Sequence, residues 1–322
     1  MSKVRVHVAL RLSEWEKSIV ESGLRNLADV VFPKGDVFED IEKAEVAIAF
    51  RIPKEVALKA EKLRFIQVPA AGADGIDLEL FARQGVIVAS SKGCNARAVA
   101  EHAFALLLAL AKRVVEQDAE MKKGGWRSHT EENFLYDIEG STLAIIGYGE
   151  IGREVAKLGR AFGMRVLAVK KTPVKDPYTD LVVGPSETLS ILAQADFVVV
   201  ALPLTQETVG FIGERELRAM KKTSFLINVA RGHVVNEEAL YKALTEGWIS
   251  GAGIDVWWRY PPEEGWPSKL GIHKLPNVIA TTHKAGWTRR ARESCLRFAV
   301  ENVARFIRGE KPLNVINPEK GY

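Results

Sequence analysis

Residues 142–152 read TLAIIGYGEIG, and this stretch decides the fold. Four consecutive apolar residues, from Leu143 to Ile146, predict a strand that is buried on both faces of a parallel sheet. Gly147, Gly149 and Gly152 follow in the pattern G-x-G-x-x-G, and the next segment, REVAKLGRAFG, has apolar residues at helical spacing. A glycine turn between a strand and a helix lets the backbone approach a diphosphate at the helix N-terminus. The stretch therefore predicts dinucleotide binding in preference to a merely flexible loop.

The composition narrows the class of protein. The chain has 322 residues, enough for two domains, and 47% of them are hydrophobic. The net charge is only +4 and no long Lys/Arg block occurs, so neither nucleic acid nor a membrane is expected as a partner. The N-terminal residues lack the apolar core of a signal peptide, and the run AFALLLALA is too short to span a bilayer. Cys94 and Cys295 are too few for a disulfide framework, which indicates a reducing, cytoplasmic location.

Short apolar strands alternate with helical patterns along the whole chain, which predicts an α/β fold with mostly parallel sheets. The expected strands are VRVHVAL, ADVVF, AEVAIAF, RFIQVP and GVIVAS before residue 95, and MRVLAVKK, ADFVVVALPLT, TSFLINVARG, ISGAGIDVWW and NVIATTH after the glycine turn. One long helix is expected over residues 98–123. A final helix after residue 287 would make the N-terminal domain discontinuous if it packs back on it.

The strand after the glycine turn bears on the choice of cofactor. It ends at Lys170, which lies 170 − 152 = 18 positions past Gly152 and is followed by Lys171 and Thr172. Proteins that bind NAD carry an Asp or Glu near this position to hold the ribose hydroxyls. Ammonium and hydroxyl groups instead attract a 2′-phosphate, so NADP(H) is favoured over NAD(H). NAD(H) stays possible if the lysines are only a solvated strand end.

Three polar residues follow later strands: Arg231 after FLINVA, Asp255 after SGAGI and His283 after NVIATT. Ligands of open α/β sheets bind at the carboxyl ends of the strands. An arginine can clamp a carboxylate, and a histidine can transfer a proton at neutral pH. Each residue alone has a structural explanation, as a salt-bridge partner, a cap or a hydrogen-bonded histidine. Together, beside a dinucleotide site, they predict carbonyl reduction or alcohol oxidation by hydride transfer.

The sequence resembles the D-isomer-specific 2-hydroxyacid dehydrogenase family, which includes glyoxylate/hydroxypyruvate reductases and phosphoglycerate dehydrogenases. The resemblance covers nearly the whole chain through the motifs QVPAAGADGID, CNARAVAEHAFALLLAL, TLAIIGYGEIG, VALPLT, LINVARGHVVNEEAL, GAGIDV and TTHKAG. It implies two Rossmann-like, doubly wound domains with a cleft between them: a substrate-binding domain of residues 1–97 plus 287–322, and a dinucleotide-binding domain of residues 98–286. It also implies a small 2-oxoacid or 2-hydroxyacid substrate and a homodimer.

The resemblance implies a role for individual residues. Arg231 would bind the substrate's carboxylate and carbonyl oxygen, and His283 would be the general acid in reduction and the base in the reverse reaction. The backbone at Gly72 and Ala73 would hold the substrate carboxylate, and Asp255 would bind the nicotinamide carboxamide. Together with the glycine turn and the end of the strand after it, the resemblance gives these expected cofactor-binding residues: Gly147, Gly149, Glu150, Ile151, Gly152, Lys170, Lys171, Thr172, Leu202, Pro203, Ala230, Asp255 and Gly286.

The chain departs from the family most clearly at position 260. The family usually has a Glu five positions past the aspartate of GIDV, where it pairs with the histidine and favours its charged form. Here that position is Tyr260, which could orient the histidine without a charge, unless Glu263 or Glu264 reaches back. The alternative function that this departure leaves open is a dinucleotide-sensing protein of the same fold with little turnover.

Other residues receive lesser roles. Trp257 and Trp258 would either narrow the site or pack in the core. His102 is expected to pack against its helix, and His233 is the only rival proton donor. No Cys/His cluster with the spacing of a metal site occurs in the sequence.

Overall fold

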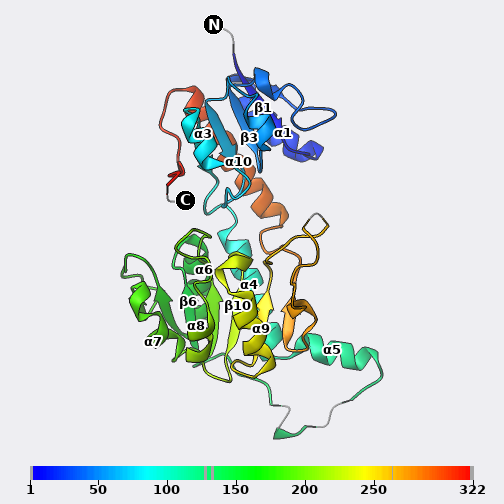
Figure 1. The fold of residues 1–322 in the computed structure, drawn as a ribbon, viewed down its shortest axis with the longest axis vertical. Helices are drawn as coiled ribbons and strands as arrows, with labels where there is room; N and C mark the ends of the chain where they lie inside the picture. The colour runs from blue at the N-terminus through cyan, green and yellow to red at the C-terminus, as the bar shows by residue number, and fades with distance from the viewer. Residues whose placement is uncertain (1–2, 127–128, 132–133, 263, 320–322) are drawn as a thin grey trace. The chain divides into compact units, whose positions relative to one another are not determined.

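The computed structural model describes residues 3–126, 129–131, 134–262 and 264–319. It forms two compact units: a first unit of Met1–Asn95 and Trp287–Tyr322, and a second unit of Ala96–Gly286 (Figure 1). Each unit contains one sheet with helices on both faces, and each is described by itself below. The prediction of two α/β domains with parallel sheets is confirmed.

The second unit contains a seven-stranded parallel sheet in the order β12-β11-β10-β9-β6-β7-β8. The strand order reverses between β6 and β9, which is where ligands bind in open α/β sheets. Its strands are β6 (Thr142–Ile146), β7 (Arg165–Val169), β8 (Leu181–Val183), β9 (Phe197–Val200), β10 (Phe225–Asn228), β11 (Gly251–Ile254) and β12 (Val278–Ala280). The short strand β8 was not expected from the sequence.

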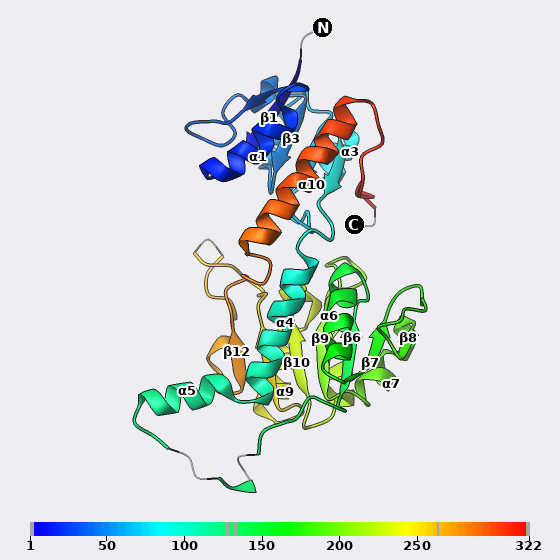
Figure 2. The same ribbon diagram turned by 180° about the vertical axis from the view of Figure 1, so that it is seen from behind.

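Helices cover both faces of this sheet (Figures 1 and 2). They are α4 (Ala96–Ala111), α6 (Glu150–Ala161), α7 (Thr188–Leu192), α8 (Glu214–Ala219) and α9 (Glu237–Thr245), with short 3-10 turns at η3 (Pro185–Glu187), η4 (Gly232–Val234) and η5 (Ile272–Lys274). Helix α5 (Val114–Lys122) follows α4 and has no buried residue. Alternate residues of each strand face opposite sides: Leu143 and Ile145 pack with α4 and α6, whereas Ala144 and Ile146 pack with α7 to α9. This explains why the central positions of these strands are apolar.

The first unit contains a five-stranded parallel sheet in the order β2-β1-β3-β4-β5. Its elements are β1 (Val4–Ala9), α1 (Glu14–Leu24), β2 (Ala28–Val31), η1 (Ile41–Lys43), β3 (Val46–Ala49), α2 (Lys54–Ala57), β4 (Phe65–Val68), α3 (Leu78–Arg83), β5 (Ile87–Ser90) and α10 (Arg289–Ile307). Leu296, Val300 and Val303 of α10 pack into one core with α1 and the sheet. The last helix therefore completes the N-terminal unit, which is discontinuous in sequence.

The prediction of a single helix over residues 98–123 is wrong. The structure has α4 and α5 in its place, separated at Arg113, whose φ is +47°. The apolar face of α4 continues to Ala111, whereas no residue of α5 is buried. Packing on the sheet holds α4, and the segment that follows projects away from it (Figures 1 and 2).

The two cysteines form a disulfide, Cys94–Cys295, within the first unit. The low cysteine count predicts no disulfide framework, whereas the structure pairs the two residues. Their separation of 201 positions gives no local indication of this pairing. None of the helices in the described part of the chain is long and apolar enough to cross a membrane.

Candidate active site

Arg231, Asp255 and His283 follow the ends of β10, β11 and β12, which are neighbours in the sheet of the second unit. The register pairs Asn228 with Ile254, and Ile254 with Ala280. Because the strands are parallel, their carboxyl ends lie at the same sheet edge, with about 4.8 Å between neighbouring strands. The three segments that carry these residues therefore lie side by side.

Asp255 organises this edge through a buried carboxylate. The hydroxyl of Thr281 donates to its Oδ1 at 2.6 Å, and the amides of Lys284 and Ala285 donate at 3.0 and 2.9 Å. Burial raises the pKa of Asp255, but hydrogen bonds from His102, Thr281 and the two amides outweigh burial and hold the pKa well below its usual range. The charged carboxylate thus fixes the turn that contains His283.

His283 lies in this turn with φ at +55°, a left-handed conformation that L-residues rarely adopt. Strained backbone of this kind persists only where surrounding contacts hold it, and here Asp255 binds the two amides that follow the histidine. The imidazole is exposed, so the turn presents it to solvent instead of packing it in the core.

Tyr260 lies against His283, with 5.3 Å between ring centroids and 32° between ring planes. The amide of Trp257 donates to the Tyr260 hydroxyl at 3.2 Å, and the Tyr260 amide donates to Glu264 Oε2 at 2.9 Å. The residue at the family's Glu position therefore contacts the histidine through the face of a ring. Glu264 holds the main chain of this loop, and Glu263 lies outside the described residues.

Arg231 begins the turn that follows β10. Its guanidinium donates to the carbonyl of Ala230 at 2.8 Å. Asn228 shapes the turn, because its side-chain amide donates to the Arg231 carbonyl at 3.1 Å and its oxygen accepts from the Ala230 amide at 3.1 Å. Asn228 is buried at the last position of an otherwise apolar strand. That polar residue at the strand end is the sequence feature from which its role in the turn could have been predicted.

Sequence reasoning also missed His102 and Thr281. His102 Nε2 lies 3.0 Å from Thr281 Oγ1 and 3.5 Å from Asp255 Oδ1, so α4 contributes to the same network. His102 therefore does more than pack against its own helix. His233, the rival proton donor, is exposed, and its carbonyl accepts from the Gly210 amide at 2.8 Å.

The two tryptophans after Asp255 are both buried in the core. Trp257 Nε1 donates to the Thr281 carbonyl and Trp258 Nε1 to the Val235 carbonyl, each at 2.8 Å. Of the two roles that the sequence left open, the structure favours core packing for both. Trp257 also braces the strand end that leads to His283.

The glycine turn lies between β6 and α6 and has the geometry that a diphosphate requires. Gly147 has φ at +105°, and a Cβ there would lie 2.7 Å from the backbone of Ala201 and Leu202. A Cβ at Gly152 would lie 2.4 Å from the Gly147 carbonyl, whereas one at Gly149 would meet open space. Helix geometry leaves the first-turn amides at Glu150 and Ile151 without intrahelical acceptors. The residues present therefore fit a dinucleotide.

The strand ends on either side of this turn carry the other predicted cofactor residues. Lys170 Nζ donates to the Tyr148 carbonyl inside the turn at 2.6 Å. Lys171 is exposed and pairs with Glu207 at 2.8 Å, and Thr172 is exposed beside it. Leu202 and Pro203 follow β9, and Pro203 is held through its carbonyl by the Thr208 hydroxyl at 2.6 Å. Gly286 ends the second unit.

Gly72 and Ala73 belong to the first unit and follow β4 at the carboxyl edge of its sheet. Both are partly exposed. The Ala73 carbonyl accepts from the Ile76 amide at 2.9 Å, and the Gly75 carbonyl accepts from the Ile52 amide at 3.2 Å. The loop is therefore anchored to the segment that follows β3.

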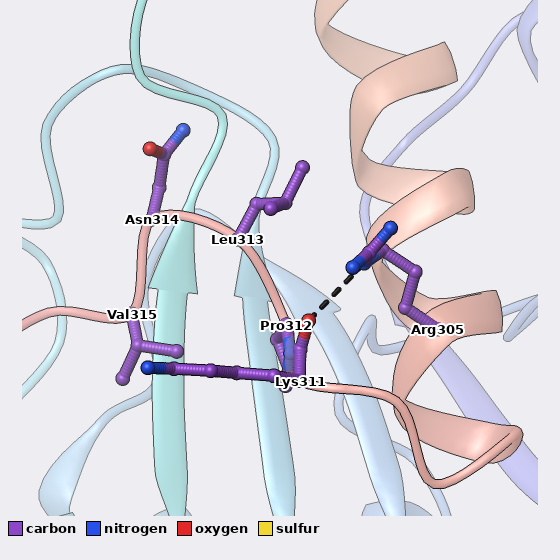
Figure 3. A pocket seen from close by; sticks show the side chains of 6 residues that line it. All are labelled: Arg305, Lys311, Pro312, Leu313, Asn314 and Val315. Atoms are coloured by element: carbon purple, nitrogen blue, oxygen red, sulfur yellow. Dashed lines mark hydrogen bonds between the residues drawn. The ribbon is translucent and has the colours of Figure 1, made fainter.

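A separate pocket in the first unit contains none of the predicted site residues (Figure 3). It lies where Arg305 of α10 donates to the Lys311 carbonyl at 3.1 Å. Its lining consists of Arg305, Lys311, Pro312, Leu313, Asn314 and Val315. Among the described residues, no group of three His, Cys, Asp or Glu side chains is arranged to hold a metal ion.

Comparison with known proteins assigns the chain to a family. Residues 104–285 match the NAD-binding domain of the D-isomer-specific 2-hydroxyacid dehydrogenases. The glyoxylate reductase of Korarchaeum cryptofilum is 40% identical over 270 residues, covering 83% of this chain and 80% of the relative.

Two solved structures are similar over nearly the full length. D-lactate dehydrogenase from Aquifex aeolicus, complexed with NAD and lactic acid, has a TM-score of 0.79 and 28% identity, covering 95% of this chain and 96% of that chain. An acyclic imino acid reductase in complex with NADPH and D-Arg has a TM-score of 0.82 and 26% identity, covering 98% and 100%. The second unit is thus a dinucleotide-binding domain. The chain belongs to the D-isomer-specific 2-hydroxyacid dehydrogenase family and is an oxidoreductase that interconverts 2-oxoacids and 2-hydroxyacids.

Proposed function

We propose that this enzyme reduces a small 2-oxoacid of the glyoxylate or hydroxypyruvate type to its D-2-hydroxy acid, with NADPH as the favoured reductant. The observation that carries the proposal is the turn at His283, which the buried Asp255 carboxylate holds at the edge where β10, β11 and β12 end. The names of the glyoxylate reductase relatives support the substrate class.

In the proposed reaction Arg231 binds the carboxylate and polarises the carbonyl oxygen of the substrate. His283 donates a proton to that oxygen as the alcohol forms, and it accepts the proton in the reverse direction. The nicotinamide cofactor supplies the hydride when it is bound. Gly72 and Ala73 bind the substrate carboxylate through their main chain. Asp255 binds the carboxamide of the nicotinamide, together with the backbone near Ala230 and Gly286.

Tyr260 is proposed as a positioning residue for His283. Its ring contact restricts the imidazole, and its own hydroxyl is tied to the Trp257 amide. A positioned ring places the proton donor in the geometry that transfer requires. Tyr260 therefore takes over the orienting part of the family's glutamate without contributing a charge.

The preference for NADP(H) is proposed from the end of β7. Lys171 and Thr172 are exposed there, and Lys170 binds the glycine turn itself. Two ammonium groups next to the turn favour a 2′-phosphate. Glu207 pairs with Lys171 and competes with that phosphate.

A homodimer is also proposed, with the surface around α5 as the contact. Val114, Val115 and Met121 on α5, and Trp126, Phe134 and Leu135 after it, are exposed large apolar residues. Apolar residues gathered on one projecting segment are typical of protein interfaces. A second copy of the chain would cover them.

We place the enzyme in the cytoplasm, where its proposed cofactor and substrate would be used.

The test measures oxidation of NADPH, and separately of NADH, by the loss of nicotinamide absorbance with glyoxylate, hydroxypyruvate, pyruvate and a bulky aromatic 2-oxoacid. The expected result is turnover of the small acids with NADPH preferred. His283→Ala should lower kcat by about 10²- to 10⁴-fold, while the matched control His233→Ala keeps the wild-type rate. Cofactor binding without turnover of any acid would instead support a dinucleotide-sensing protein.

A further inference from the structure

We propose that Cys94 and Cys295 are a thiol–disulfide modification site, which small-molecule thiols and disulfides open and close and which controls the stability of the first unit. The two residues are bonded, their Cα atoms are 4.9 Å apart, and they are separated by 201 positions in the sequence. Nothing in the proposed reaction uses either sulfur.

The disulfide lies close to both points where the chain passes between the units. Cys94 lies in the loop between β5 and α4, and the first unit ends one residue later at Asn95. Cys295 lies in α10, which begins shortly after the chain returns to the first unit at Trp287. The bond therefore joins the departing segment to the returning helix and closes the discontinuous unit on itself.

Other contacts hold α10 in place without the bond. Arg292 forms an ion pair with Glu16 at 2.7 Å, in which each side chain is only 11% exposed. Ser91 Oγ donates to the Cys295 carbonyl at 3.1 Å, and Asn302 Nδ2 donates to Gln67 Oε1 at 2.6 Å. Leu296, Val300 and Val303 belong to the core. Reduction therefore leaves the fold intact and removes only the covalent restraint on the unfolded chain.

The two cysteines differ in access to solvent. Cys295 is buried, whereas Cys94 is partly exposed, so Cys94 is the sulfur that an incoming thiolate attacks. Attack breaks the Cys94–Cys295 bond, forms a mixed disulfide at Cys94 and releases Cys295 as a thiolate. A second thiolate attacks the mixed disulfide, releasing Cys94 as a thiolate and a small-molecule disulfide. The reverse sequence, with that disulfide as the oxidant, closes the bond.

A cross-link of this span stabilises mainly by restricting the unfolded chain. The closed form should therefore melt about 5–15 °C above the open form. Intracellular disulfides are either transient and redox-sensing or structural in heat-adapted organisms. The Cys94–Cys295 bond, which exchanges while the fold persists, belongs to the first kind.

The experiment uses the full chain, equilibrated with oxidised glutathione or with dithiothreitol. Thiols are counted with Ellman's reagent in denaturant, and melting is followed by circular dichroism. We expect no free thiols and a higher melting temperature after oxidation, and two free thiols and a lower melting temperature after reduction. Cys94→Ser should melt like the reduced wild type in both conditions, which controls for effects of the reagents.

Cys295→Ser also removes the bond, but it changes a buried residue. If that variant fails to fold, the comparison uses Cys94→Ser alone. Two free thiols after treatment with oxidised glutathione would overturn the proposal. Equal melting temperatures of the two wild-type forms would overturn it as well. A bond that native-state dithiothreitol cannot open would exclude its role as an exchanging site.

Discussion

At the scale of single residues, Tyr260 and Asp255 decide how His283 is presented. One contacts the imidazole through a ring face, and the other binds the amides of the two residues that follow it. The family's usual glutamate would combine orientation and charge in one side chain. Here the charge is buried in Asp255, and it acts on the backbone of the turn.

The positioning role of Tyr260 can be tested with variants that change its aromatic ring, its hydroxyl group or its charge separately. Tyr260→Phe keeps the ring contact and should keep kcat within about threefold, whereas Tyr260→Leu loses it and should lower kcat about tenfold. Tyr260→Glu should move the alkaline limb of the reduction profile to higher pH, because a carboxylate favours the imidazolium. Steady-state rates across pH check all three variants. An unchanged profile for Tyr260→Glu would contradict contact between positions 260 and 283.

The contribution of Asp255 to the stability of the folded protein should depend on pH. The low pKa of its carboxyl in the folded state means that its contribution is full at neutral pH, because the unfolded group titrates near pH 4. Below about pH 4 the unfolded chain takes up the proton first, so this contribution declines as the pH falls. Asp255→Asn should therefore melt below the wild type at pH 7, and the difference should shrink on acidification. The exposed Glu187→Gln is the control, and a difference constant with pH would contradict the prediction.

At the scale of elements, the turn between β6 and α6 and the end of β7 form one surface, which we propose as the cofactor-binding surface. Lys170 connects them directly, since its side chain binds the Tyr148 carbonyl. The loop after β9 closes against the same turn, because the backbone of Ala201 and Leu202 lies 2.7 Å from where a Cβ at Gly147 would be. Three consecutive strand ends thus meet at the place where the strand order reverses.

The pair Lys171–Glu207 should tune cofactor choice from this surface. Lys171→Ala should weaken NADPH binding about three- to fivefold, the range of an exposed ion pair, and leave NADH binding nearly unchanged. Glu207→Gln should strengthen NADPH binding, because it removes the carboxylate that competes for Lys171. Fluorescence titration of both cofactors measures these affinities without turnover. Equal effects on NADPH and NADH would show that the pair does not face a 2′-phosphate.

At the scale of the whole molecule, the chain is divided so that each unit completes its own sheet and core. The first unit depends on a helix that comes from the other end of the sequence. The second unit carries α5, which packs on neither face of its sheet and exposes apolar side chains. The folds of the two units therefore leave two features without an explanation. These are the Cys94–Cys295 bond and the apolar surface on α5.

The proposed dimer can be tested on α5. Val115→Glu combined with Met121→Glu should convert a dimer into a monomer, because two charges would be buried at the contact. Leu58→Glu is a matched control, since Leu58 is 54% exposed and Val115 is 53% exposed, but Leu58 lies in the first unit. Sedimentation velocity measures the species present. A monomeric wild type would contradict the proposal.

The sequence alone determined what depends on local pattern. The G-x-G-x-x-G turn, the doubly apolar strands and the polar residues after three of those strands follow from spacing over a few residues, so residues 142–152 and positions 231, 255 and 283 could be identified in advance. Parallel pairing then brings those strand ends to one edge. The family resemblance added the substrate class.

Only the tertiary structure decided contacts between residues far apart in the chain. The Cys94–Cys295 bond, the His102–Thr281–Asp255 network and the break of the helix at Arg113 have no local signal. Each depends on which side chains packing brings together after the sheets have formed. Asp255 shows the division most clearly: its place after a strand could be predicted from the sequence, whereas its buried bonds to the turn of His283 exist only in the folded protein.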